Sequence, residues 1–406
     1  MIQQELIPHL FRTEFSKITA VLTRLFGLSH MNVAEDIASD TFLSALETWP
    51  YKGVPEKPEA WLYAVARNKA RNYLQRNKTL HDKVIHQLTI EATTELDVDL
   101  SDQNISDSLL QMMFTLSHPV LSTEAQVALS LRILCGFGID EIATAFVTNK
   151  ETIYKRLLRA KEKLREENLR IEFPAAAELD MRLDAVLTTL YLLFSEGYYS
   201  ENNEAVIREE FCSEAMRLTL LLLANEPTNQ PRVKALYALM CFHASRLSAR
   251  KNTMGEIILY DQQDESLWNQ QLITKGALFL KSASEGSRLS KYHIEAGIAY
   301  WHTVKEDSHE KWENILQLYN RLLQLEYSPI AALNRTYALS RANGKDQAIR
   351  EAEKLNLSDN HFYYVLLGEL YSDIDNPKAL ECLRKAAALA KTEADKQIVL
   401  KRIAMF

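Results

Sequence analysis

The sequence is short of the residues that interrupt helices, with only 11 glycines and 10 prolines in 406 residues. This scarcity disfavours a fold of short strands and tight turns, and it favours an all-α fold. The four cysteines stand singly, with no CxxC pair and no Cys/His cluster. Neither a disulfide framework nor a zinc site is therefore expected.

Long apolar runs are also missing. The longest, Leu218 to Ala224, is far shorter than the ~20 residues that span a bilayer. Residues 1–10 carry charge and polarity where a signal peptide needs an apolar stretch. We therefore expect a soluble cytoplasmic protein that makes no membrane contact.

The sequence lacks the common catalytic signatures. It contains no glycine-rich phosphate loop, no GxSxG and no HExxH. Its histidines do not have the spacing of metal ligands, as in His243, His293, His302 and His361. We expect no catalytic residue, no metal and no cofactor, and hence a protein that is not an enzyme.

Charge is distributed unevenly along the chain. The net charge of −7 argues against a uniformly basic nucleic-acid binder, so any such surface must be local. Residues 150–165 carry seven basic and two acidic side chains, a net charge of +5. Residues 81–120 instead carry seven acids against one lysine, and part of this segment is expected to be a mobile linker.

Apolar periodicity divides the chain into four segments. Residues 1–80 predict three helices, with a loop from Trp49 to Pro55 and a last helix that opens at Pro58. Residues 81–120 form the acidic segment, in which 106–116 are a candidate short helix. Residues 121–172 predict three short helices, and residues 173–406 are helical almost throughout.

The segment 121–172 has the layout of a helix-turn-helix. Glycines at 136 and 138 end its first helix, and Thr148 is expected to cap the third helix in a capping box with Glu151. A recognition helix needs cations to hold phosphates and amino-terminal side chains to reach base edges. A solvated charged face would explain a basic helix alone, but the preceding break and cap favour DNA. The candidate DNA-binding residues are Lys150, Glu151, Thr152, Lys155, Arg156 and Arg159.

A second basic stretch has no acidic residue from Ala60 to Leu80, and three aromatic residues are interleaved with its cations. Aromatic rings and arginines on one helix suit a strand whose bases are unstacked. Trp61 is more readily interpreted as a core anchor, whereas the polar residues favour binding. The candidates here are Trp61, Arg67, Asn68, Arg71 and Arg76.

Three motifs occur in a recognisable order. They are AEDIASDTFLSAL at 34–46, PEAWLYAVARN at 58–68, and GIDEIA at 138–143 followed by TIYKRLLRAK at 152–161. Together they resemble regions 2 and 4 of bacterial RNA polymerase sigma factors of the extracytoplasmic-function type, over about residues 5–170. The chain departs from the family pattern at Asn72, where many relatives have aspartate, and at Ser39-Asp40, where Gln-Glu is usual.

The resemblance implies a region 2 helical bundle in 1–80, a region 4 helix-turn-helix in 121–172 and a role in transcription initiation. It implies two partners, promoter DNA and core RNA polymerase with its β′ clamp helices and β flap. The basic helix of 58–80 would read and melt the −10 element together with the preceding loop, and the helix from Lys150 would read the −35 element. The residues expected to bind core polymerase are Glu35, Asp36, Asp40 and Phe42.

The carboxyl-terminal segment has its own pattern. Residues 329–352 and 361–386 are weakly similar units with a period just over 30 residues, close to that of a tetratricopeptide repeat. Segments 182–199, 255–268 and 328–335 resemble a sigma factor subgroup with a long tetratricopeptide-like extension. Such an extension implies an unidentified partner and a modulating role.

Other functions remain open from the sequence. A dimeric helix-turn-helix regulator explains residues 121–172 but not the first segment. A helical-repeat scaffold that does not bind core polymerase explains the second half but not the two basic helices.

Overall fold

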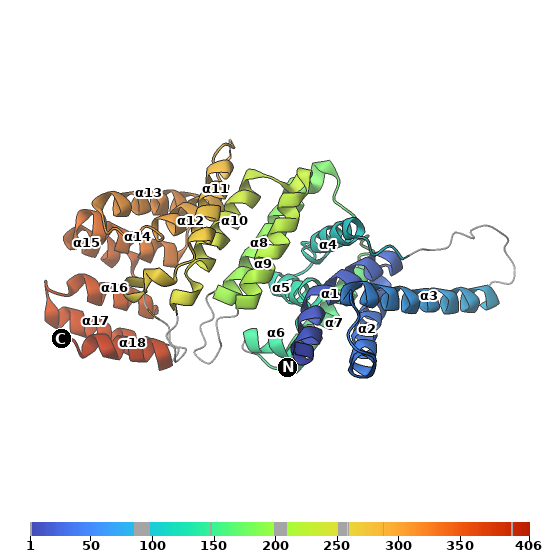
Figure 1. Ribbon diagram of the computed structural model, residues 1–406. Helices are drawn as coiled ribbons and strands as arrows, with labels where there is room; N and C mark the ends of the chain where they lie inside the picture. The colour runs from blue at the N-terminus through green and yellow to red at the C-terminus, as the bar shows by residue number, and fades with distance from the viewer. Residues whose placement is uncertain are drawn as a thin grey trace. The chain divides into compact units, whose positions relative to one another are not determined.

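A computed structural model describes residues 2–84, 98–146, 148–198, 209–250, 258, 260–286, 288–390 and 393–406 (Figure 1). These residues form helices and connecting turns, with no strand among them, so the predicted all-α fold is confirmed. The chain divides into two compact units, Met1–Leu193 and Phe194–Phe406. The first therefore contains both predicted DNA-binding segments.

The first unit is built around the amino-terminal helix α1, whose buried face includes Phe15, Ile18 and Leu22, none of them accessible to solvent. This helix packs against α2, α3 and α4. The helices of this unit are α1 (Ile2–Phe26), α2 (Met31–Lys52), α3 (Pro58–Val84), α4 (Asp102–Leu116), α5 (Thr123–Leu129), α6 (Ile139–Ala145), α7 (Lys150–Glu166) and the start of α8 (Ala176–Tyr198).

Two predictions about connections need correction. The loop expected from Trp49 begins only at Gly53, because α2 continues through Pro50 to Lys52 and ends at a glycine with a φ of 81°. Proline in the last turn removes only one helix hydrogen bond. Trp49 itself is 2% exposed and packs edge-on against Trp61, with ring centroids 5.4 Å apart.

The acidic segment 81–120 also holds more structure than its charge indicates. Residues 85–97 lie outside the described residues, but the candidate short helix at 106–116 is confirmed and extends over 102–116 as α4, which packs against α1. Its apolar side chains recur at helical spacing and are buried, among them Ile105, Leu109 and Met112. The acids of this helix are thus confined to its exposed face, and only its apolar face joins the core.

The second unit consists of successive helices that pack against one another, as α10 with α11, α13 with α14 and α16 with α17 (Figure 1). The predicted units 329–352 and 361–386 correspond to two helix pairs, α14 with α15 and α16 with α17. The full set is α9 (Glu209–Ala224), α10 (Pro231–Ala244), α11 (Gln270–Ala283), α12 (Lys291–Trp301), α13 (His309–Leu325), α14 (Pro329–Asn343), α15 (Lys345–Leu355), α16 (His361–Tyr371), α17 (Asn376–Leu389) and α18 (Glu393–Ile403).

Candidate nucleic-acid and polymerase interface

The helix α7 is amphipathic, and its apolar face anchors it. Four buried residues recur at helical spacing and pack into the first unit, namely Ile153, Leu157, Ala160 and Leu164. The helix is capped by Asn149, whose side chain accepts a hydrogen bond of 2.8 Å from the Thr152 N–H. The predicted cap Thr148 is therefore wrong by one residue.

The helix-turn-helix layout depends on two glycines. Gly136 has a φ of 69°, which ends the preceding helix in a conformation that other residues rarely adopt. Gly138 opens α6, and its N–H donates to the Glu141 carboxylate at 2.7 Å. This side chain satisfies one of the free N–H groups at the start of α6.

The outward face of α7 is cationic. Lys155, Arg156, Arg159 and Lys163 line a groove of about 520 Å³ between this helix and α5. The wall opposite them includes the hydroxyl of Ser122, at the start of α5. A groove with four cations attracts a polyanion such as a phosphate backbone.

The first turn of α7 is exposed and its charges form weak surface pairs. Lys150 contacts Asp140 at 2.6 Å and Lys155 contacts Glu151 at 2.6 Å, with all four side chains more than half exposed. Exposed ion pairs contribute about 0–1 kcal/mol, so these side chains are free to exchange partners for phosphate at little cost. Thr152 and Arg159 are also exposed, and Arg156 is half-buried above the Phe146 ring.

The second basic helix, α3, presents polar side chains while its aromatic rings face other helices. Asn68, Arg71 and Arg76 are exposed, and the Arg67 Nε donates to the Val98 carbonyl at 3.0 Å. Trp61 is half-buried against Trp49, as its interpretation as a core anchor predicts.

The other two rings of α3 also pack against neighbouring residues. Tyr63 donates a hydrogen bond of 2.5 Å to the Glu14 carboxylate. Burial and this carboxylate raise the pKa of Tyr63 far above its usual range, so the phenol stays neutral. Tyr73 packs against Phe26, with ring centroids 5.1 Å apart. In this conformation, the exposed arginines and asparagine of α3 are better placed to meet nucleic acid than its aromatic rings.

The four candidate polymerase-binding residues of α2 separate into two groups. Glu35 and Phe42 lie in the interior, 8% and 3% exposed, whereas Asp36 and Asp40 are exposed. Two leucines that the motif did not single out, Leu43 and Leu46, are 51% and 53% exposed. The surface of α2 thus combines acidic and apolar side chains. Exposed leucines on a helix surface often mark a binding site, and the sequence-based candidates did not include these two.

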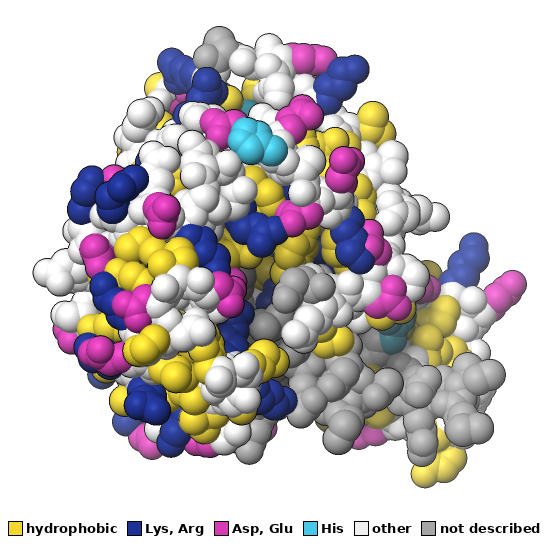
Figure 2. All heavy atoms as spheres, turned by 90° about the vertical axis from the view of Figure 1, so that its left-hand side faces the viewer, with side chains coloured by type: hydrophobic (Ala, Val, Ile, Leu, Met, Phe, Trp, Pro, Cys, Tyr) yellow, Lys and Arg dark blue, Asp and Glu magenta, His cyan; other side chains and the backbone are white. Residues whose placement is uncertain are grey.

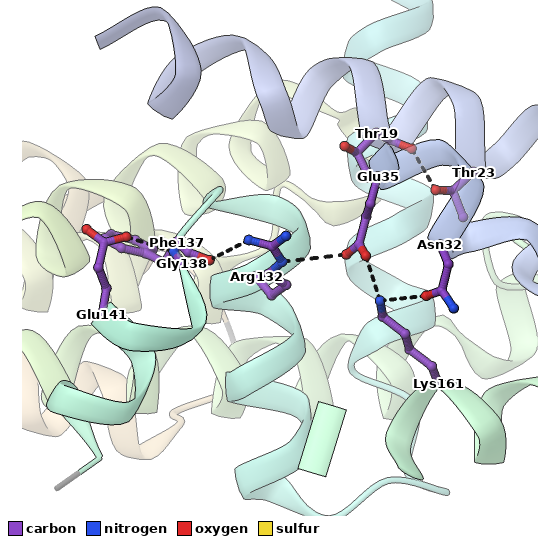
Figure 3. A network of polar contacts seen from close by, with 9 residues as sticks. All are labelled: Thr19, Thr23, Asn32, Glu35, Arg132, Phe137, Gly138, Glu141 and Lys161. Atoms are coloured by element: carbon purple, nitrogen blue, oxygen red, sulfur yellow. Dashed lines mark hydrogen bonds and ion pairs between the residues drawn. The ribbon is translucent and has the colours of Figure 1, made fainter. Parts of the chain in front are cut away.

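Glu35 is the centre of a polar network that links three elements (Figure 3). Its carboxylate lies 2.7 Å from the Lys161 Nζ of α7 and 3.7 Å from the Arg132 Nε. Lys161 also donates to the Asn32 side chain at 3.0 Å, and Arg132 donates to the Phe137 carbonyl at 3.2 Å. Lys161 therefore faces α2, unlike the groove-lining cations of the same helix.

No group of histidine, cysteine or carboxylate side chains within the described ranges is arranged to hold a metal ion. In the same part of the chain, no helix combines the length and the hydropathy that crossing a bilayer requires. All four cysteines are buried, and none of them forms a disulfide bond. The charged surfaces of α2, α3 and α7 are accordingly the strongest candidates for function in the first unit.

The comparison with protein families bears on this interface. Residues 10–79, which include α2 and most of α3, match the model of sigma-70 region 2. The chain therefore carries a sigma-70 region 2 domain, which supports its membership of the sigma factor family. A region 2 domain indicates promoter recognition of the kind that sigma factors perform. The region 2 match includes all nine candidate residues on α2 and α3, but it does not extend to α7.

Two further matches extend beyond region 2. Residues 182–284 match a family of unknown function, DUF6596. A protein of Rhizobium meliloti (strain 1021), described as uncharacterized, is 32% identical over 374 residues, which are 90% of this chain and 88% of the relative. The two proteins belong to one family over nearly their whole length. No solved structure matches the chain.

Proposed function

We propose that this protein is a sigma factor of the extracytoplasmic-function type that binds core RNA polymerase and directs it to promoters. The observation that carries the proposal is the region 2 match. The same unit also exposes a second cationic helix, α7, which follows α6 in a helix-turn-helix layout. Region 2 alone supports sigma function, and the α7 groove supports a second contact with DNA. Such a protein acts in the cytoplasm, where polymerase and promoter meet.

Each surface receives a role under this proposal. The exposed part of α2, with Asp36, Asp40 and Leu43, binds the β′ clamp helices. The exposed polar residues of α3, Asn68, Arg71 and Arg76, contact the −10 element. Arg67 and Trp61 hold α3 in position through their contacts with Val98 and Trp49.

The first turns of α7 contact the −35 element, with region 4 docked on the β flap. Cations here hold phosphates, while the amino-terminal side chains of the helix approach base edges. This role falls to Lys150, Glu151, Thr152, Lys155, Arg156 and Arg159.

The second unit is proposed to be a tetratricopeptide-like domain that modulates promoter binding or polymerase engagement. Its support is the series of packed helix pairs, such as α14 with α15 and α16 with α17. A helical-repeat domain of this kind generally holds a partner.

Assembly with core polymerase tests the proposal. The purified chain is expected to comigrate with core polymerase and to confer run-off transcription. Asp40→Ala combined with Leu43→Ala should weaken assembly with core polymerase by at least about tenfold. Both side chains are exposed on α2, and the double substitution removes their proposed contacts with the polymerase. Leu278→Ala on α11, also an exposed leucine, is the matched control. A chain that binds promoter DNA without core polymerase would instead be a helix-turn-helix regulator.

A further inference from the structure

The second unit contains a cluster of cations and aromatic rings that the proposed promoter contacts do not use. We call it the Arg246 cluster. It brings together side chains from the short turns after α10 and from the ends of α12 and α13. Its members are Arg246, Tyr260, Gln263, Trp268, His302, Lys311 and Trp312.

Arg246 is the centre of this cluster. The residue is only 8% exposed, and its guanidinium carbon lies 5.2 Å from the Tyr260 ring centre and 6.0 Å from that of Trp268. Its Nε is buried without a hydrogen-bond partner. No carboxylate in the described part of the chain forms an ion pair with it. A buried cation without a counter-ion is strongly unfavourable, so the binding of an anion next to Arg246 would stabilise the folded protein.

A second cation of the cluster is satisfied only by neutral groups. Lys311 is 1% exposed, and its Nζ donates to the Tyr260 hydroxyl at 3.1 Å and to the Val304 carbonyl at 2.5 Å. The carboxylate that contacts the cluster, Asp307, is already bound by the Trp312 indole N–H and by Arg341. Among the described side chains of the cluster, positive charge therefore exceeds negative charge.

The ionisation of neighbouring groups reflects this excess. Burial, Arg246 and Lys311 lower the pKa of His302 to about 3. Burial also lowers the pKa of Lys311, and Arg246 and Arg341 add to that effect while Asp307 opposes it. The positive field of Arg246 is thus felt by several groups in the interior.

The cluster also contains polar atoms suited to an oxyanion. The Trp268 Nε1 and the His302 Nδ1 are buried with no hydrogen-bond partner. An indole N–H can only donate, and a neutral imidazole offers one donor. Donors next to an unpaired guanidinium form the usual environment of a bound carboxylate or phosphate group.

We propose that the Arg246 cluster binds a small oxyanion, a carboxylate or phosphate group carried by a diffusible molecule, with Arg246 as the counter-ion and the Trp268 indole N–H as a second donor. Arg246, Tyr260 and Trp268 all lie within the 182–284 match of unknown function, which assigns no ligand. On the face that Figure 2 shows, lysines and arginines are intermingled with aspartates and glutamates. The described surface in this view therefore has no patch of purely positive charge that would compete with the Arg246 cluster for an anion.

This site goes beyond the proposed promoter function, and its test needs neither polymerase nor DNA. Thermal unfolding of the full-length chain is followed while sodium phosphate or sodium acetate replaces sodium chloride at fixed pH and ionic strength. Binding to the folded state raises Tm with the logarithm of anion concentration. Because phosphate also stabilises folded proteins without binding, the anion whose rise depends more on Arg246 identifies whether the site prefers phosphate or carboxylate.

Arg246→Gln is expected to abolish the anion-dependent rise in Tm, whereas Arg350→Gln, an exposed arginine on α15, should leave it unchanged. Without added anion, Arg246→Gln should be at least as stable as the natural chain, because it removes an unpaired buried charge. Equal responses of the natural chain and Arg246→Gln to both anions would overturn the proposal.

A second variant keeps the test decisive if Arg246→Gln fails to fold. Trp268→Phe retains the ring but loses the N–H donor, so it should weaken anion binding by about tenfold in calorimetric titration. Unchanged affinity in Trp268→Phe, or no measurable binding of either anion to the natural chain, would also overturn it.

Discussion

At the scale of single residues, the pairs that matter most are those whose partners lie far apart in the sequence. Glu35 and Lys161 are 126 positions apart, yet they form an ion pair with little solvent exposure between α2 and α7. A buried carboxylate depends on such partners, because removing one leaves a charge without compensation. The stability of α2 in the folded protein therefore depends on the packing of α7 against it.

Lys161→Ala is expected to destabilise the first unit by about 2 kcal/mol or more, since Glu35 keeps only the more distant Arg132 as a cation partner. Urea unfolding measures the change. Lys163→Ala, an exposed lysine on the same helix, should stay within about 0.5 kcal/mol of the natural chain. Equal effects of the two substitutions would contradict the role given to the Glu35 pair.

His302 makes the stability of the second unit depend on pH. Its folded pKa is about 3 and its ordinary value is 6.5, so the unfolded chain binds a proton at pH values where the folded chain does not. The stability that the neutral imidazole provides is present above about pH 6.5 and is lost as pH falls toward about 3.

His302→Phe keeps a ring beside Tyr260 and removes this titration. The natural chain should lose up to ~1.4 kcal/mol more per pH unit than the variant between about pH 6 and pH 4. Urea unfolding at a series of pH values measures the difference. Parallel curves for the two proteins would show that His302 is not responsible.

At the scale of elements, α7 shows what sequence reasoning can predict. The glycines at 136 and 138 and the apolar spacing of Ile153, Leu157 and Leu164 are local signals, and they place the helix and its buried face. The predicted cap lies one residue before the observed cap, Asn149, because Thr148 is also a common capping residue.

Burial that depends on distant contacts could not be predicted in this way. The sequence places Glu35 on an amphipathic helix with other acids, and only the packing of α7 and Arg132 around it explains its burial. The candidate short helix at 106–116 is confirmed as α4, because Leu109 and Met112 carry a local helical period, but its start at Asp102 lies four residues earlier than predicted.

For α7 we expect Arg159→Ala to weaken binding to promoter DNA through the loss of a phosphate contact. The slope of log affinity against log salt should become shallower by about 0.9. Lys396→Ala, on α18 in the second unit, is the control. An unchanged slope for Arg159→Ala in fluorescence anisotropy titrations would argue against a phosphate contact by the α7 groove.

At the scale of the whole molecule, the chain combines a unit with sigma region 2 and a unit of stacked helix pairs. In the first unit, α2 offers acidic and apolar side chains, while α3 and α7 offer cations. This division of charge fits one protein partner and one polyanion. The interior positive charge of the second unit adds a candidate point at which a small anion acts on the same protein.

The most direct test of this account is a DNA footprint of the holoenzyme on a promoter that it transcribes. Protection is expected at two separate elements upstream of the start site, with Arg159→Ala losing protection at the upstream element and Arg76→Ala at the downstream one. Protection that neither substitution alters, or no protection beyond that of core polymerase alone, would contradict it.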